Sequence, residues 1–300
     1  MLTIFSSPKA FRGHFALIQR NAIGSWKELC PLPQIILFGN SEGTAATIAE
    51  FGLEHVPTVE TNEFGTPLLH SLFENAERLS RFDLLCYVNA DIILTEGFGR
   101  AIREMAGRPD FLMVGARMNL QIDTPISFDS GWRDRLRHEY TTRGAVGDHS
   151  GIDFFTFRRG FYKEIPPLAI GRAWFDQWLI KAALERHAAV IDTSKLVPIV
   201  HQNHDYGHLA GGREFAYKGI EAQRNLALCG AEHAYTLLDC SHELEPDGRL
   251  RRIRGRRLRF KAKQLLWQTF VQRTMGIRNM LRLRRKYWKS EGEGRERCAP

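Results

Sequence analysis

Short apolar runs alternate with helix-like patterns along most of this chain, and this alternation limits the possible folds more than any other feature. Mainly apolar runs at residues 2–5, 34–38, 84–88 and 111–114 are predicted as buried strands. Helical patterns lie between them, at residues 11–29, 44–51, 66–79 and 97–105. Strands of this length that are joined through helices pair in parallel and are covered on both faces. We therefore predict an α/β protein with a mostly parallel sheet flanked by helices.

Length and cysteine usage narrow the class of protein further. A chain of 300 residues with 43% hydrophobic content can bury a large core. No stretch reaches the roughly 18 apolar residues of a membrane span, and residues 1–8 lack the pattern of a secretory signal. The five cysteines show no C-x-x-C spacing, which favours reduced thiols over a zinc finger or a disulfide scaffold. These features predict a cytoplasmic protein.

The net charge of +8 is unevenly distributed along the sequence. Residues 1–248 contain 24 Lys and Arg against 31 Asp and Glu, whereas residues 249–290 contain 16 Lys and Arg and no acid. A turn-like Glu245-Pro246-Asp247-Gly248 precedes the change. We therefore predict a body over residues 1–248 and a basic tail over residues 249–300.

The basic tail has the pattern of an amphipathic helix. Its apolar residues recur at helical spacing: Trp267, Phe270, Val271, Met275, Ile277, Leu281 and Trp288. Cationic side chains around an aromatic and aliphatic face are typical of helices that lie on an anionic membrane surface. Two alternatives are that this face packs on the body and that the charges bind nucleic acid without sequence specificity.

Polar residues follow several of the predicted strands. Asn89 and Asp91 interrupt an apolar run at 84–94, and alternation along an extended strand would place both on one face. An ionised carboxylate in apolar surroundings needs a cation or hydrogen-bond donors, so Asp91 is a candidate metal ligand; the alternative is a simple strand-end turn. Neither G-x-G-x-x-G nor a P-loop motif is present, which argues against a dinucleotide site and a P-loop NTPase.

The second half of the body contains three further polar segments. A predicted strand at 150–157 has Asp153 near its start. A predicted helix from 170 to about 187 has Asp176 in its first turn, where the helix dipole favours a carboxylate. A third segment, at 201–208, places three histidines after a predicted strand. His201 or His204 could complete a metal site with Asp91. The alternative is a hydrogen-bonded loop.

These segments together resemble the nucleotide-diphospho-sugar transferases, glycosyltransferases of the GT-A fold, over residues 1–212. The resemblance rests on G-I-D-F-F-T-F at 151–157, G-R-A-W-F-D-Q-W-L at 171–179, H-Q-N-H-D-Y at 201–206, and N-A-D at 89–91. It implies a Rossmann-like mostly parallel sheet flanked by helices, whereas the basic C-terminal helical extension is predicted from charge and spacing alone. The commoner metal motif has Asp where this chain has Asn89, which weakens one ligand.

The resemblance also implies roles for individual residues. Asp91 would bind Mn²⁺ or Mg²⁺ together with a histidine of the 201–208 segment, for which His201 and His204 are the candidates. Asp176 would be the catalytic carboxylate, and Asp153 would hold a sugar. The nucleotide sugar, most commonly a UDP-sugar in this fold, would contact Ser6, Ser7, Asn40, Thr66, Asn89 and Arg172.

The chemistry of such a site can be stated from the residue types. Cleavage of a sugar–phosphate bond leaves negative charge on a diphosphate, which a divalent ion and Arg158 or Arg172 would stabilise. Asp176 is the first candidate to accept the proton of the attacking hydroxyl, and Asp153 is the second candidate. A phosphatase that uses the first Asp of D-x-D as nucleophile is disfavoured, because that position is Asn89. The residues at 121–147 are predicted to form a loop or helix over the site.

The functional prediction is therefore a metal-dependent glycosyltransferase that acts on a glycan or lipid-linked acceptor. The basic tail would place it in the cytoplasm at the inner face of the membrane, and nucleic acid is the less favoured partner. The alternative is a catalytically inactive protein of the same fold that serves as a membrane or nucleic-acid adaptor, and Asn89 is its main support.

Overall fold

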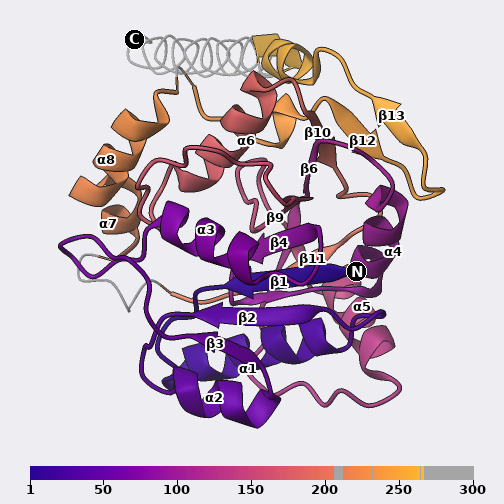
Figure 1. Ribbon diagram of the computed structural model, residues 1–300. Helices are drawn as coiled ribbons and strands as arrows, with labels where there is room; N and C mark the ends of the chain where they lie inside the picture. The colour runs from indigo at the N-terminus through magenta and orange to yellow at the C-terminus, as the bar shows by residue number, and fades with distance from the viewer. Residues whose placement is uncertain (206–211, 232, 264, 267–300) are drawn as a thin grey trace, which may run out of the picture. The chain divides into compact units, whose positions relative to one another are not determined.

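The computed structural model describes residues 1–205, 212–231, 233–263 and 265–266 (Figure 1). The chain divides into two compact units, Met1–Ile253 and Arg254–Pro300. In the second unit, residues 256–263 and 265–266 are helical, and Leu258, Leu265 and Leu266 are exposed. The seven residues of the predicted apolar face, from Trp267 to Trp288, lie outside the described residues, so the amphipathic helix stays a prediction.

A nine-stranded sheet forms the framework of the first unit. Its strands are β1 (Leu2–Ser6), β2 (Gln34–Phe38), β3 (Glu54–Val56), β4 (Leu84–Val88), β6 (Phe111–Val114), β9 (Phe154–Arg158), β10 (Ala189–Asp192), β12 (His242–Leu244) and β13 (Leu250–Arg252). They lie in the order β13-β12-β10-β6-β9-β4-β1-β2-β3. β9 is antiparallel to both β4 and β6, and β13 is antiparallel to β12, whereas the other neighbours pair in parallel. The predicted α/β fold with a mostly parallel sheet is confirmed.

A smaller four-stranded sheet includes residues that follow β4 in the sequence. It contains β5 (Ile92–Ile93), β11 (Ile199–Gln202), β7 (Arg117–Leu120) and β8 (Ala145–Val146), in that order. β11 is antiparallel to β5 and parallel to β7. This sheet therefore brings the end of β11 beside the residues that follow β4.

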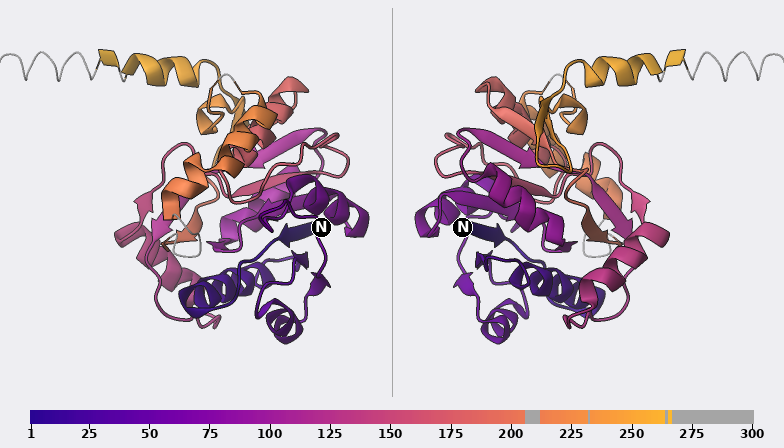
Figure 2. Two further views of the ribbon diagram at one scale, coloured as in Figure 1. Left: turned by 90° about the vertical axis from the view of Figure 1, so that its left-hand side faces the viewer. Right: turned by 90° about the vertical axis from the view of Figure 1, so that its right-hand side faces the viewer.

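Helices cover both faces of the large sheet. They are α1 (Gly13–Lys27), α2 (Thr44–Phe51), α3 (Leu69–Leu79), α4 (Glu96–Met105), α5 (Trp132–Thr142), α6 (Phe175–Glu185), α7 (Gly212–Lys218) and α8 (Ile220–Cys229), with a short 3₁₀ turn at Leu237–Asp239. Figure 2 shows the indigo helices α1 and α2 on the same side of the sheet.

Alternate side chains of the strands enter two separate cores. In β4, Leu85 and Tyr87 pack with α3 and α6, whereas Leu84, Cys86 and Val88 pack with α1 and α4. All five residues of β4 are therefore buried, as expected for a strand covered on both faces. The carboxyl end of this strand is fixed from both sides.

Two helices begin later than the sequence predicts. α3 starts at Leu69, because Pro67 forms an isolated bridge with Thr61 in extended structure, and Thr66 does not cap the helix. α6 starts at Phe175, because Gly171 (φ 72°) and Trp174 (φ 84°) are left-handed and cannot continue a helix from residue 170. Asp176 is in the first turn of α6, as predicted.

Two further boundaries differ from the prediction, and the segment predicted as a loop or a helix contains a helix. The strand predicted at 150–157 is β9, which starts at Phe154 and runs antiparallel. Residues 121–147 contain a helix, α5. The first unit ends at Ile253 because β13 pairs with β12, so it extends five residues past the boundary predicted at residue 248.

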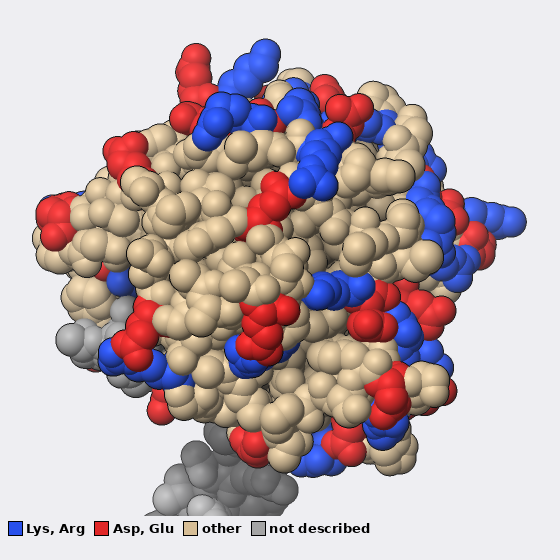
Figure 3. All heavy atoms as spheres, turned by 60° about the horizontal axis from the view of Figure 1, so that its bottom comes forward, with Lys and Arg blue, Asp and Glu red and all other residues tan. Residues whose placement is uncertain are grey.

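Two observations bear on partners. Among the described residues, no helix combines the length and the hydropathy that crossing a bilayer requires. On the face shown in Figure 3, acidic and basic side chains are interspersed and much of the centre is uncharged.

Candidate metal and sugar-transfer site

Three residues from distant parts of the sequence meet where β4 ends. β5 pairs with β11 so that Ile92 lies opposite His201, which places the histidine beside Asp91. One ligand atom each of Asp91, His201 and His204 lies within 4.8 Å of the other two. The structure thus brings together the three residues that the sequence predicts as metal ligands.

The spacing of these atoms fits a small divalent cation. Asp91 Oδ2 lies 2.9 Å from His204 Nε2 and 4.0 Å from His201 Nε2. Neighbouring ligands of an octahedral ion with bonds of about 2.1 Å are about 3 Å apart, which is close to the shorter distance. Two polar atoms of the cluster, Asp91 Oδ1 and His201 Nδ1, are buried and have no hydrogen-bond partner among the described residues. The donor set of one carboxylate and two imidazoles suits Mn²⁺ and similar ions.

The hydrogen bonds of His204 point to a cation at this place. Its Nδ1 lies 2.6 Å from the carbonyl oxygen of Asp205, an acceptor, so Nδ1 has to carry a proton. In the neutral ring, Nε2 would then direct a lone pair at the Asp91 carboxylate 2.9 Å away. The contact is favourable only if Nε2 is protonated too or if a cation lies between the atoms. A ligating histidine that donates its other N–H to a carbonyl is the usual arrangement in metal sites.

The electrostatic environment keeps Asp91 ionised. Burial raises the pKa of Asp91, but the hydrogen bond with His204 and the positive charge of Lys9 oppose burial, and the pKa of Asp91 lies well below its usual range. Burial lowers the pKa of His201, which leaves its imidazole neutral and able to donate a lone pair. Both states are the ones that metal binding requires.

Gln202 fixes the histidine segment to the strand end. Its side chain is fully buried, and its Nε2 donates to the carbonyl oxygens of Asp91 (3.0 Å) and Ile18 (2.7 Å). Its Oε1 accepts from Asn21 Nδ2 at 3.1 Å. Gln202 therefore joins α1, Asp91 and β11. In the sequence, Gln202 stands out only as part of the H-Q-N-H segment.

Asp153 and Asn89 form a second polar group beside the cluster. Asn89 Nδ2 donates to Asp153 Oδ1 at 2.8 Å, and Arg117 Nη1 donates to Asp153 Oδ2 at 2.9 Å. Tyr87 in turn donates its hydroxyl proton to Asn89 Oδ1 at 3.1 Å. Sequence reasoning missed Arg117, because nothing local distinguishes it from the other arginines; it enters the site through the pairing of β7 with β11.

Asp176 faces the same cavity from the start of α6. Burial, together with the nearby charge of Asp153, raises the pKa of Asp176 to about 7, although the Gln177 backbone amide opposes the shift. The preceding Trp174 has a left-handed backbone, a conformation that costs on the order of 1–3 kcal/mol in a residue with a side chain. Such strain is often found where a fold fixes a functional side chain.

The cavity that joins these groups has a volume of about 200 Å³. We call it the metal cavity; the residues that line it and that bear charge or imidazole are Lys9, Asp91, Arg117, Asp148, Asp153, Arg172, Asp176, His201 and His204. Lys9 has no ion pair among the described residues, and burial lowers its pKa. The two carboxylates predicted as catalytic, Asp153 and Asp176, thus share one cavity with the metal cluster.

Arg172 lines the metal cavity, but its guanidinium is bonded to residues outside that cavity. Its Nε donates to Glu221 Oε2 at 2.7 Å, and its Nη2 donates to Thr66 Oγ1 at 3.2 Å. Glu221 is 1% exposed and also accepts from Asn62 Nδ2. Thr66 therefore supports Arg172. Glu221 was not singled out from the sequence.

The residues predicted at the nucleoside lie on the same sheet edge but outside the metal cavity. Ser7 and Asn40 follow β1 and β2, and Ser7 Oγ donates to the Phe38 carbonyl at 3.4 Å. Ser6 is fully buried, with its hydroxyl bonded to the Val88 carbonyl at 2.6 Å, so its side chain does not face a ligand. Their roles stay predictions.

Arg158 is wrongly predicted as a phosphate-binding residue. β9 is antiparallel to β4, so Arg158 lies opposite Leu84, at the start of β4 rather than at its carboxyl end. Its guanidinium donates to the carbonyls of Ala106 and Arg108. Lys9 and Arg117 supply positive charge to the metal cavity instead.

In the comparisons with known proteins, only solved structures are similar to the chain. No protein-family model and no curated protein sequence matches the chain. A glucosyl-3-phosphoglycerate synthase from Mycobacterium tuberculosis, solved with Mn²⁺ and UDP, is similar over 78% of this chain and 81% of its own, with 14% identity and a TM-score of 0.46. The mannosyltransferase PcManGT from Pyrobaculum calidifontis, solved with GDP-mannose and Mn²⁺, is similar over 69% of this chain and 58% of its own, with 13% identity and a TM-score of 0.42.

The first of these proteins is described as a synthase of glucosyl-3-phosphoglycerate and the second as a mannosyltransferase. Similarity at this level does not assign an activity to the chain. Its own side chains have to carry the functional argument.

Proposed function

We propose that this protein is a metal-dependent glycosyltransferase that moves a sugar from a nucleoside diphosphate donor to an acceptor hydroxyl. One observation carries the proposal: Asp91, His201 and His204 converge on a cavity that also contains Asp176. A divalent ion held there supplies positive charge that stabilises the departing diphosphate. Asp91, His201 and His204 would hold the ion and leave room for phosphate oxygens and water.

The diphosphate is expected to lie against Lys9. Its amine lines the metal cavity and has no ion pair among the described residues, whereas Arg117 is engaged by Asp153 and Arg172 by Glu221. The donor nucleoside would then extend towards Ser7 and Asn40, along the carboxyl edge of β1 and β2. Ligands of parallel sheets commonly bind at this edge.

The two candidate carboxylates are suited to different tasks. Both oxygens of Asp153 are engaged, by Asn89 and Arg117, so Asp153 is suited to fixing a sugar rather than accepting a proton. Asp176 has a pKa of about 7, close to the optimum for a general base at neutral pH. We therefore assign proton removal from the acceptor hydroxyl to Asp176.

The acceptor is proposed to be a glycan or a lipid-linked sugar, reached from the cytoplasmic surface of a membrane. The support is the charge of residues 249–290, which contain 16 Lys and Arg and no acid. Flotation with anionic liposomes should distinguish the full chain from a truncation at Ile253, which preserves the β12–β13 pair. Equal flotation of both forms would remove this part of the proposal.

A donor panel tests the activity. UDP-, GDP- and dTDP-sugars are added with and without Mn²⁺, and the shift in melting temperature is followed by an assay of nucleotide release. We expect one nucleotide to stabilise the protein only when Mn²⁺ is present. No stabilisation by any donor with either Mn²⁺ or Mg²⁺ would contradict the proposal and favour the inactive adaptor.

A further inference from the structure

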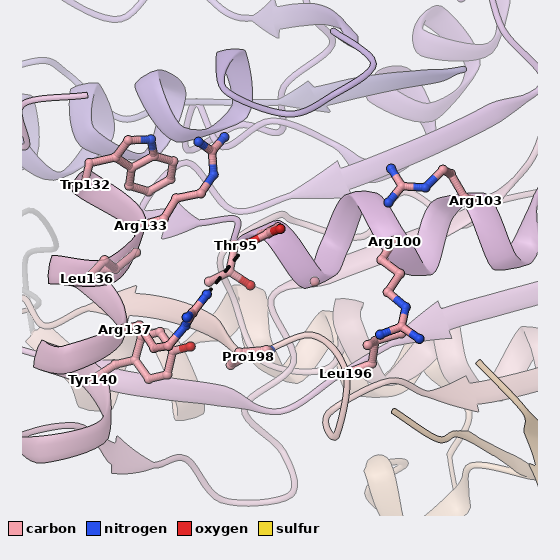
Figure 4. A pocket seen from close by; sticks show the side chains of 12 residues that line it. Thr95, Arg100, Arg103, Trp132, Arg133, Leu136, Arg137, Tyr140, Leu196 and Pro198 are labelled. Atoms are coloured by element: carbon pink, nitrogen blue, oxygen red, sulfur yellow. Dashed lines mark ion pairs between the residues drawn. The ribbon is translucent and has the colours of Figure 1, made fainter. Parts of the chain in front are cut away.

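A second cavity, unrelated to the metal cavity, lies between α4 and α5 (Figure 4). It has a volume of about 290 Å³ and adjoins another of about 450 Å³, and the two share Thr95, Arg103, Trp132 and Arg133 among their lining residues. We call them together the arginine cleft. No residue that lines it also lines the metal cavity.

Four arginines line this cleft, and their charges are poorly compensated. Arg100 has no hydrogen bond or ion pair among the described residues, and Arg103 donates only to the carbonyl of Cys30, at 3.2 Å. Figure 4 shows these two on one side of the cleft and Arg133 and Arg137 on the other.

The carboxylates near Arg133 and Arg137 lie farther away than in a typical charge-assisted hydrogen bond. Arg137 lies 3.7 Å from Glu96 and 3.4 Å from Asp134. Arg133 lies 3.9 Å from the Glu28 carboxylate and donates to the Glu28 carbonyl at 2.6 Å. Charge-assisted hydrogen bonds are usually about 2.7–2.9 Å long. Glu96 lines the cleft but its side chain is 72% exposed, so it can turn away into solvent.

Two buried donors in the cleft have no partner. Thr95 is 9% exposed and Trp132 is 2% exposed, and neither Thr95 Oγ1 nor Trp132 Nε1 has a hydrogen bond in the described part of the chain. Thr95 is also the N-cap residue of the ten-residue helix α4, yet its side chain makes no capping bond. Figure 4 places Thr95 between the two pairs of arginines. Buried donors of this kind normally have an acceptor.

The rest of the lining is apolar. Leu136, Leu196, Pro198 and Tyr140 form part of the first cavity. A bare phosphate would contact the arginines but would leave these side chains uncovered. An organic group attached to the phosphate could pack on them.

We propose that the arginine cleft is a binding site for a phosphate ester. The phosphate would accept hydrogen bonds from the arginines and Thr95 at the amino end of α4, where the helix dipole favours an anion. The organic part would cover Leu136, Leu196 and Pro198. The ester can be a soluble metabolite or the headgroup of an anionic lipid, since both present the same phosphate. This site does not depend on the proposed sugar transfer.

Calorimetric titration of the full chain with glycerol 3-phosphate, without divalent ions, tests the site. The double variant Arg100→Ala/Arg137→Ala removes two exposed cations that the fold does not use and should weaken binding about tenfold or more. Thr95→Val removes one hydroxyl without changing charge and should weaken it a few-fold.

A matched double variant, Arg78→Ala/Arg135→Ala, removes the same charge outside the cleft; these arginines donate to Asn75 and Asp129. It should bind like the parent, which separates a built site from general attraction to a basic protein.

Vesicles of phosphatidylcholine with and without phosphatidic acid provide the second arm of the test. Sedimentation measures how much protein binds to them.

The two arms identify the source of the phosphate. Loss confined to glycerol 3-phosphate in the Arg100/Arg137 variant supports a soluble ester, and loss confined to phosphatidic acid vesicles supports a lipid headgroup. The proposal is overturned if the parent binds neither probe, or if the cleft variant and the matched variant behave alike in both arms.

Discussion

The metal cavity and the arginine cleft lie at opposite ends of β11, and their charges are arranged in different ways. At the carboxyl end, His201 and His204 face Asp91, and Arg117 bonds to Asp153 at 2.9 Å. At the amino end, Pro198 lines a cleft where, among the described residues, no carboxylate lies nearer than 3.4 Å to one of the cleft's arginines. The first site is organised by pairs between its own residues, whereas the second has three donors, on Arg100, Thr95 and Trp132, that have no hydrogen-bond partner among the described residues. Substitutions should therefore affect the two regions differently.

Loss of Asp91 should have the largest effect. Changes to outer-shell partners of metal ligands cost 10–100-fold in affinity, so we expect Asp91→Ala to weaken Mn²⁺ binding about a thousandfold, or ~4 kcal/mol. Electron paramagnetic resonance of free Mn²⁺ measures this. Asp83→Asn, at the opposite end of the same strand, is the control and should bind like the parent. Equal affinity of the Asp91 variant and the control would refute the metal cluster.

Arg117 tests whether the metal cavity is held together by its internal pairs. Asp153 is only 5% exposed, so Arg117→Met would leave a buried carboxylate with Asn89 as its remaining side-chain partner. Breaking such a pair commonly costs 3–5 kcal/mol, and because Arg117 is partly exposed we expect about 3 kcal/mol in the free energy of unfolding. Urea denaturation at pH 7 measures it. A loss below about 1 kcal/mol would show that this network contributes little to stability.

The two regions also differ in how far the sequence predicts them. Strands at 34–38, 84–88 and 111–114 and the helix at 44–51 match the structure, because apolar runs and helical spacing depend on local pattern. Asp91, His201 and His204 were found for a similar reason, since each is a polar residue within or shortly after an apolar run.

What sequence reasoning missed depends on tertiary pairing. Arg158 was placed at the site for its positive charge, and the antiparallel pairing of β9 with β4 puts it at the other end of β4. Arg117 and Glu221 enter through contacts with segments far away in sequence. The arginine cleft was missed altogether, since arginines on two helix surfaces look like solvated residues until α4 and α5 are known to be neighbours.

Asp176 makes a pH-dependent prediction. Its folded pKa of about 7 lies above the unfolded value near 4, so the folded state binds the proton more tightly. The stability that protonated Asp176 provides is present at low pH and is lost as the pH rises through 7. We expect the parent to lose about 2 kcal/mol relative to Asp176→Asn between pH 5 and pH 8.

Turnover should show the opposite dependence and rise towards pH 7 in the parent, because the base acts when it is deprotonated. In Asp176→Asn, turnover should be low at every pH, whereas the affinity for Mn²⁺ should be unchanged. Glu185→Gln, near the other end of α6, is the matched control. Parallel stability curves for the parent and Asp176→Asn would contradict the raised pKa. Normal turnover in the variant would contradict its role as the base.

Arg137 should give the smallest effect and completes the comparison with Arg117. Its guanidinium is 55% exposed and lies 3.4 Å and 3.7 Å from two carboxylates that are themselves largely in solvent. Exposed pairs of this kind contribute about 0–1 kcal/mol, so we expect Arg137→Met to change the free energy of unfolding by less than about 0.5 kcal/mol. Urea denaturation beside Arg117→Met measures both. A loss as large as that of Arg117→Met would mean that Arg137 is part of the fold's own framework, and its charge would then not be available for a ligand.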